Sequence, residues 1–133
     1  MARMRINCPD CNFDLSVNVG QSIVRDKLVW HRSINCSNCG AVYEEDGNET
    51  PEEIRSAIIK ENGLWGISLV SVESKTIVYK VLRECLGLSL SDITKLSNND
   101  SIISGTETEV SWLRNKFEDK GISAVIKRLE VKQ

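Results

Sequence analysis

Four of the five cysteines form two pairs with the same internal spacing, Cys8-Pro9-Asp10-Cys11 and Cys36-Ser37-Asn38-Cys39. Two residues between the cysteines let one tight turn direct both thiolates at a single ion, and two such turns supply the four ligands that tetrahedral Zn²⁺ prefers. Gly40 follows the second pair, where the chain must turn sharply. Because four thiolates leave no open coordination position, we expect one structural Zn²⁺ bound by Cys8, Cys11, Cys36 and Cys39.

Two other chemistries use the same cysteines and are less favoured. A redox pair of the thioredoxin type needs a βαβ surrounding, which the sequence does not indicate. Iron in a rubredoxin-like site would use the same four ligands. His31, the only histidine, lies five residues before Cys36 and could replace a ligand, but four cysteines already suffice and we expect a partly exposed structural role. Cys85 stands alone, and we expect it to pack in a core.

The doubled cysteine pair resembles the zinc ribbon family, in which short β-hairpins end in two cysteine knuckles. We expect strands at Arg3–Asn7 and Ala41–Glu45, each beside a pair, and one ordered stretch between them at Ser22–Trp30. A segment of this size has little core, and zinc binding at about 10–16 kcal/mol apparent would supply its folding free energy. We therefore assign residues 1–46 to a zinc ribbon domain.

The charge of the chain is concentrated in a short middle segment. The 133 residues carry a formal net charge of −2. Residues 1–45 hold five basic and five acidic groups, residues 46–63 hold two and five, and residues 64–133 hold ten and nine. Within the acidic segment, Thr50, Pro51 and Glu53 predict a capped helix start and Asn62-Gly63 predicts its end. We expect an acidic connector helix over residues 47–63.

No sequence feature indicates export or a membrane. The first ten residues lack the apolar run of a secretory signal. The most apolar stretch, Leu64–Val72, is too short to span a bilayer. Five cysteines, an odd number, do not suit a framework of disulfide bonds, and four of them have the spacing of metal ligands. Both features favour a reducing compartment, so we expect a cytoplasmic protein with no membrane association.

The second half alternates strands and helices. We expect strands at Leu64–Val72, near Ile102-Ile103 and over Ile122–Leu129, with helices at Lys75–Leu86, Ser91–Ser97 and Glu107–Lys120. The last helix has a capping box of Thr106 and Glu109 and ends at Gly121. At 100° per residue, the helix at 75–86 separates an apolar face from a basic face. The apolar face holds Ile77, Val78, Val81, Leu82 and Cys85, and the basic face holds Lys75, Thr76, Tyr79, Lys80 and Arg83.

Residues 64–130 resemble the C-terminal domain of the bacterial ribosomal stalk protein. The likeness rests on the lysine-led helix Lys75–Leu86, on the Gly87-Leu88-Ser89-Leu90 turn after it, and on Gly105–Val125. It implies a compact domain of three helices on a three-stranded antiparallel sheet, a fold related to that of the adaptor of the Clp protease. The whole chain is then α+β, with a zinc ribbon in place of the stalk family's dimerisation region and hinge.

The resemblance and the basic helix face together favour protein binding. In the stalk family this surface captures translation GTPases, and Lys75, Lys80 and Arg83 occupy matching positions. We expect a non-enzymatic, bacterial adaptor or regulator whose partner is an acidic, partly apolar surface of a translation factor, a ribosomal element, a protease or a toxin. The site residues are Lys75, Tyr79, Lys80 and Arg83. No base stands beside a nucleophile and no glycine-rich phosphate loop is present, which argues against an enzyme.

The competing interpretation is a nucleic-acid-binding zinc ribbon. Arg25, Lys27 and Arg32 would contact phosphates, and Trp30 would stack on a base. The zero net charge of residues 1–45 argues against this interpretation.

Overall fold

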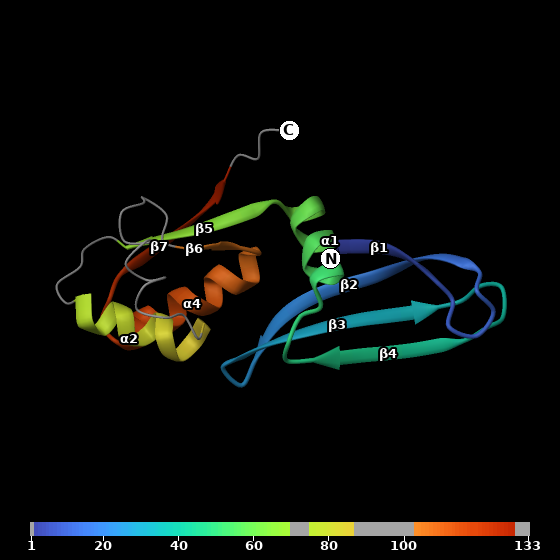
Figure 1. Ribbon diagram of the computed structural model, residues 1–133, viewed down its shortest axis with the longest axis horizontal. Coiled ribbons are helices and arrows are strands. Elements are labelled where there is room, and N and C mark those ends of the chain that lie inside the picture. The colour runs from blue at the N-terminus through green and yellow to red at the C-terminus, as the bar shows by residue number, and fades with distance from the viewer. Residues whose placement is uncertain (1, 70–74, 87–102, 130–133) are drawn as a thin grey trace. The chain divides into compact units, whose positions relative to one another are not determined.

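The computed structural model describes residues 2–69, 75–86 and 103–129. The chain divides into two compact units, Met1–Gly63 and Leu64–Gln133, and each is described by itself. The described residues form three helices and two antiparallel sheets, so the fold is α+β as predicted (Figure 1).

The N-terminal unit is built on a four-stranded antiparallel sheet in the order β1-β2-β3-β4. The strands are β1 (Ala2–Asn7), β2 (Asp14–Val24), β3 (Lys27–Asn35) and β4 (Val42–Gly47). The short strands predicted beside each cysteine pair are confirmed as β1 and β4. Between the pairs, the structure has two long strands where the sequence analysis expected only one ordered stretch. The alternation of buried Leu15, Val17 and Val19 with exposed polar residues explains the length of β2.

A two-residue turn joins β2 to β3. Arg25 and Asp26 both have positive φ, 50° and 68°, as a type I′ hairpin turn requires. β1 pairs with β2 only over Asp14–Val19, and β4 pairs with β3 only over residues 30–35. The end of this hairpin, residues 20–29, therefore extends beyond its neighbours as a two-stranded ribbon.

Helix α1 (Glu52–Asn62) packs against β1 and β2 (Figure 1). Its buried residues Ile54 and Ile58 join the hydrophobic cluster of the sheet. The other buried members of that cluster are Ala2, Cys8, Leu15, Val17, Val19, Ile34 and Cys36. The helix that the sequence predicted as a connector thus supplies part of the N-terminal core.

The capping predicted for the start of α1 is wrong: Thr50 does not cap the helix, Pro51 is not its first helical residue, and Glu53 completes no capping box. Pro51 is the N-cap residue and no side chain caps the helix. The hydroxyl of Thr50 instead accepts a hydrogen bond from Nε2 of Gln21 at 2.9 Å. Gly63 ends the helix with φ 92°, as predicted.

Two glycines of the sheet lie beneath aromatic rings. Gly47 is opposite Trp30, and a Cβ placed on Gly47 would lie 2.7 Å from Nε1 of the indole. Gly20 is opposite His31, and a Cβ there would lie 2.6 Å from Cε1 of the imidazole. Gly47 is the last residue of β4, and its lack of a side chain leaves room for the Trp30 ring.

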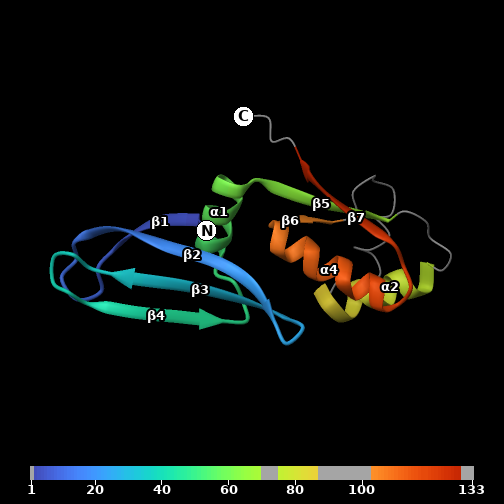
Figure 2. The ribbon, with the colours of Figure 1, turned by 180° about the vertical axis from the view of Figure 1, so that it is seen from behind.

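The C-terminal unit has a three-stranded antiparallel sheet in the order β6-β5-β7 (Figure 2). Its elements are β5 (Leu64–Leu69), α2 (Lys75–Leu86), β6 (Ile103–Gly105), α4 (Glu107–Asp119) and β7 (Ala124–Leu129). α4 packs against all three strands and α2 packs against α4. The buried residues of this core are Ile67, Val78, Val81, Leu82, Val110, Leu113, Phe117 and Ile122.

The capping box predicted for the last helix is confirmed. The hydroxyl of Thr106 accepts from the backbone N–H of Glu109 at 3.1 Å, and the Glu109 carboxylate accepts from the backbone N–H of Thr106 at 3.0 Å. Gly121 follows the helix with φ 79°. The helix expected at Ser91–Ser97, residues 70–72 of the first predicted strand, and Ile102 lie outside the described residues.

Within the described part of the chain, no helix combines the length and the apolar character needed to span a bilayer.

Candidate metal centre

Two turns of the same design present the cysteines. In the first knuckle, Cys8 donates its N–H to the carbonyl of Phe13 at 2.8 Å, and Asn12 donates to the carbonyl of Cys8 at 2.9 Å. In the second, Cys36 donates to Ala41 at 2.9 Å and Gly40 donates to Cys36 at 2.8 Å. Asn12 and Gly40 occupy equivalent places, and both are left-handed, with φ 64° and 79°. The sharp turn predicted at Gly40 is confirmed, and the first knuckle uses asparagine for the same purpose.

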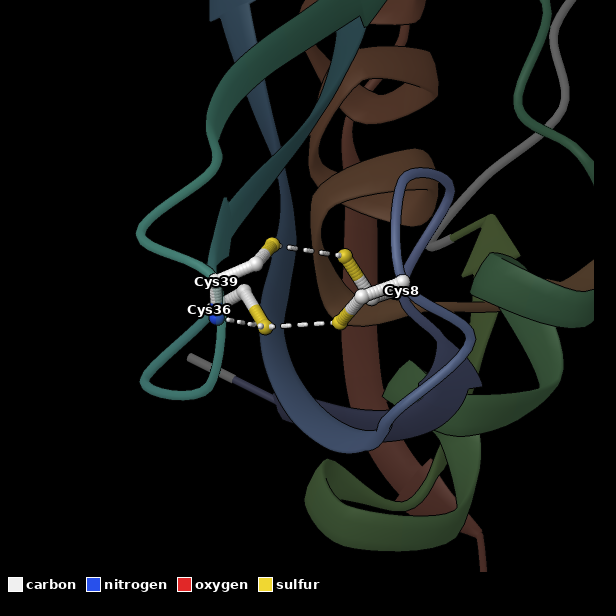
Figure 3. Close-up of side chains that lie close together, drawn as sticks. Cys8, Cys36 and Cys39 are labelled. Atoms are coloured by element: carbon white, nitrogen blue, oxygen red, sulfur yellow. Dashed lines mark hydrogen bonds between the residues drawn. The ribbon is translucent and has the colours of Figure 1, made fainter.

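The four sulfur atoms meet between the two knuckles (Figure 3). The Sγ atoms of Cys8 and Cys39 are 3.7 Å apart, and those of Cys11 and Cys36 are 3.6 Å apart. All four lie within 4.8 Å of one another. A zinc tetrathiolate with bonds of about 2.3 Å has sulfur–sulfur edges of about 3.8 Å, whereas a disulfide bond is about 2.05 Å long. The spacing fits one metal ion and confirms the predicted cluster.

The site is buried on one side and open on the other. Cys8 and Cys36 are 3% and 4% exposed and belong to the hydrophobic cluster of the sheet. Cys11 and Cys39 are exposed. A metal ion bound here would lie against the end of the core with its outer two ligands in contact with solvent.

Three residues that the sequence analysis did not single out connect the knuckles. Asn38, in the second knuckle, donates from Nδ2 to Sγ of Cys11 in the first at 3.3 Å. Tyr43, on β4, donates its hydroxyl to Oδ1 of Asp10 at 2.6 Å. Asn38 and Asp10 lie inside the two C-x₂-C units, which could have drawn attention to them. Tyr43 carries no such signal.

The thiols of the exposed pair differ in acidity. The amide of Asn38 and the backbone N–H of Phe13 lower the pKa of Cys11 to about 6. The backbone N–H of Ala41 lowers the pKa of Cys39, but desolvation and the hydrogen bonds of Cys39 with the other three thiols outweigh it and raise that pKa to about 12. The hydrogen bond from Asn38 therefore favours the thiolate form of Cys11.

The phenol of Tyr43 is also perturbed. Its hydrogen bond to Asp10 is the largest cause that raises the pKa of Tyr43, because the carboxylate favours the protonated hydroxyl as a donor. Tyr43 thus stays a hydrogen-bond donor across the neutral pH range.

The residues expected to bind nucleic acid differ in their surroundings. Arg25 and Lys27 are exposed at the end of the β2–β3 hairpin. Trp30 is partly buried and packs against the hydrophobic cluster. Arg32 forms an ion pair with Glu45, with Nη2 of the guanidinium 2.7 Å from Oε1 of the carboxylate. His31 is partly exposed and lies outside the cysteine cluster.

Helix α2 carries the residues expected to bind a protein partner. Lys75 is its first residue, and Lys80 and Arg83 are exposed. Tyr79 is half-buried and packs against the core. On the predicted apolar face, Val78, Val81 and Leu82 are buried and Cys85 packs against the core. Ile77 is the exception, with 37% of its surface exposed.

Comparison of the chain with protein-family models, with curated proteins and with solved structures finds no match, so neither the zinc ribbon resemblance nor the stalk resemblance gains support from a relative.

Proposed function

We propose that this chain is a non-enzymatic cytoplasmic zinc protein, in which one structural Zn²⁺ folds the N-terminal unit and the C-terminal unit binds a protein partner. The observation that carries the metal assignment is the spacing of the four sulfurs, 3.6 and 3.7 Å across the gap between the knuckles. Soft thiolate ligands in a tetrahedral set favour zinc, and iron is the alternative occupant of the same geometry.

The role proposed for the metal is structural. Four thiolates complete its coordination, which leaves no position for a substrate. Cys8 and Cys36 belong to the same hydrophobic cluster as Leu15 and Ile34, so the metal would close the end of the core. Apparent binding free energies of about 10–16 kcal/mol are as large as the whole stability of an ordinary domain, about 5–15 kcal/mol. The N-terminal unit is then expected to fold only with metal.

Native mass spectrometry of the full chain, purified under reducing conditions, tests the metal assignment. The expected result is one zinc per chain. Cys36→Ser should lose the metal, and Cys85→Ser, which removes the one cysteine outside the cluster, should keep it. A wild-type chain that carries no metal, and whose sheet persists in strong chelator, would contradict the assignment.

The partner surface is proposed on α2. Lys80 and Arg83 are three residues apart on one rigid helix, and both are exposed. The buried residues Val78, Val81 and Leu82 anchor the helix, so the two charges are held in place. Such a surface suits an acidic partner, and the half-buried ring of Tyr79 would add apolar contact. The order of β5, α2, β6, α4 and β7 is compatible with the stalk-like arrangement on which this part of the proposal draws.

A pull-down from nuclease-treated host lysate tests the partner surface. The full chain should retain a defined protein that the double variant Lys80→Glu/Arg83→Glu loses. Lys60→Glu, a charge reversal at an exposed position of α1, is the matched control and should retain it. Retention by all three chains would contradict the proposal.

Binding measurements with the same full chain distinguish the nucleic-acid interpretation from the partner surface on α2. The ion pair of Arg32 and the packing of Trp30 leave Arg25 and Lys27 as its exposed contacts. Binding to nucleic acid that weakens steeply with salt, and that Arg25→Ala or Lys27→Ala abolishes, would favour that interpretation over the partner surface on α2.

A further inference from the structure

The two hairpins that carry the knuckles separate before they reach the metal centre. The ladder between β2 and β3 runs from Val24 opposite Lys27 to Asn18 opposite Ser33, and its register stops there. β1 continues to pair with β2 as far as Asp14, and β3 continues to pair with β4 as far as Asn35. Near the cysteines, each hairpin is therefore intact but the backbones of the two hairpins are not joined to each other.

Besides the contacts among the four thiols themselves, two side-chain hydrogen bonds cross this split. Tyr43 belongs to the second hairpin and donates to Asp10 in the first knuckle at 2.6 Å. Asn38 belongs to the second knuckle and donates to Sγ of Cys11 in the first at 3.3 Å. Both donors, Tyr43 and Asn38, belong to the β3–β4 hairpin, and both acceptors belong to the β1–β2 hairpin. Each acceptor, a carboxylate or a thiolate, is an anion in its ionised form.

Each bond has the geometry and charge of a strong contact. The phenol-to-carboxylate bond is short and charge-assisted, and the amide-to-thiolate bond is at the normal distance for a sulfur acceptor. Both are exposed to solvent, which reduces the contribution of each. The two bonds matter because they orient the knuckles that carry the ligands. Groups that orient metal ligands from outside the coordination sphere change metal affinity about 10- to 100-fold.

We propose that Tyr43 and Asn38 are positioning residues of the metal centre: they hold the two knuckles at the spacing of the bound state, so that zinc binds more tightly and leaves more slowly. This inference rests on the proposed zinc site. Tyr43 acts on Asp10 and does not contact a sulfur. Asn38 donates directly to the sulfur of Cys11 and so stabilises the negative charge of that ligand.

The chain offers a matched control for the hydrogen bonds. Ser33 on β3 donates its hydroxyl to Glu44 on β4 at 2.7 Å. This bond joins two strands of the same hairpin and does not cross the split. Ser33→Ala therefore removes a cross-strand bond of similar length from the same part of the sheet without affecting the connection between the knuckles.

The experiment measures zinc release from the full chain into excess chelator and zinc affinity by competition. Tyr43→Phe should release zinc about three- to tenfold faster than the wild type, and Asn38→Ala should bind it about tenfold more weakly. Ser33→Ala should behave as wild type. Asn38→Asp keeps the shape but replaces the donor with a second negative charge beside Cys11, so it should bind zinc more weakly than Asn38→Ala.

Cobalt substitution separates the two roles. The thiolate-to-Co²⁺ charge-transfer band should shift in Asn38→Ala, which alters a ligand sulfur, and stay in place in Tyr43→Phe, which does not. If Tyr43→Phe and Asn38→Ala release zinc at the wild-type rate, or if Asn38→Asp equals Asn38→Ala, the inference is wrong while the zinc site stands. If the wild-type chain binds no metal, the proposed site itself is wrong.

Discussion

Two residues of the N-terminal unit, Arg25 and Asp26, adopt backbone φ angles that residues with a Cβ rarely adopt. Arg25 and Asp26 both adopt positive φ in the β2–β3 turn, a region that costs a residue with a Cβ about 1–2 kcal/mol. Asparagine is the residue that type I′ turns prefer at the first of these positions. The turn therefore keeps its shape because the strands on either side determine it.

Replacing the first turn residue should make the protein more stable. Arg25→Asn is expected to raise the free energy of unfolding of the N-terminal unit by about 0.5–1 kcal/mol, because asparagine tolerates positive φ better than arginine. Urea denaturation of the metal-loaded chain measures the change. Lys27→Asn removes the same charge from the adjoining strand and is the control; an equal gain in both variants would attribute the effect to charge.

The sequence predicted the ligands of the metal centre but not the residues around them. The repeated C-x₂-C spacing depends on neighbours along the chain, which a sequence displays directly. The bond from Tyr43 to Asp10 joins residues 33 positions apart, and the bond from Gln21 to Thr50 joins residues 29 apart. The latter replaces the local cap predicted for Thr50, because a partner from a distant strand takes up the hydroxyl. Contacts of this kind depend on which distant segments the fold brings together, which the pattern of residue types along the chain does not show.

At the scale of elements, two aromatic side chains of β3 each lie over a glycine of a neighbouring strand. Trp30 lies over Gly47 on β4, and His31 lies over Gly20 on β2. Both rings are partly buried, and the larger indole of Trp30 also packs against the hydrophobic cluster. The same added methyl group should therefore have different effects at the two glycines.

Gly47→Ala should destabilise the N-terminal unit by about 1–3 kcal/mol, because the indole must leave its packed position to admit the Cβ. Gly20→Ala should cost less, since the imidazole is smaller than the indole and has less packed surface to lose when it moves. Thermal unfolding followed by tryptophan fluorescence in a Trp65→Phe/Trp112→Phe background, which leaves Trp30 as the reporter, measures both. Equal costs in the two variants would show that loss of glycine from the strand, and not the ring above it, determines the effect.

The capping box of α4 allows a second test at this scale. Thr106 is fully buried and accepts from the backbone N–H of Glu109. Thr106→Ala should lower the stability of the C-terminal unit by about 0.5–2 kcal/mol, the range for loss of an N-cap. Thr108→Ala, two residues later in the first turn of the same helix, should cost much less. Hydrogen exchange of peptides from α4 during denaturation provides the comparison.

Elements were predictable where the signal was local. Thr106 with Glu109 and the glycines Gly63 and Gly121 marked helix ends that the structure contains. The prediction placed order at Ser22–Trp30, at the end of the β2–β3 hairpin, and missed its base at residues 14–21 and 31–35. The alternation of Leu15, Val17 and Val19 with polar residues is a local signal for the first of these missed parts.

At the scale of the whole molecule, the two units have separate hydrophobic clusters. The buried residues of the first run from Ala2 to Ile58, and those of the second run from Ile67 to Ile122. Cys8 and Cys36 are part of the first cluster alone. Loss of metal should therefore affect one unit and leave the other folded.

Adding strong chelator to the full chain under reducing conditions should unfold Met1–Gly63 and leave Leu64–Gln133 intact. Hydrogen–deuterium exchange with peptide-level detection should show loss of protection in β1–β4 and α1, with β5, α4 and β7 still protected. Restoring zinc should restore protection. Loss of protection in both units at the same chelator concentration would show that they fold as one.

The burial of Cys8 and Cys36 within the first cluster has a consequence for the living cell. If the ligands of a metal are also core residues, a newly made chain that finds no zinc exposes Leu15, Val17 and Ile54 together. Proteases remove such chains, so the amount of this protein would follow the zinc supply rather than its rate of synthesis alone. Abundance, rather than activity, would then be the first property to change under metal starvation.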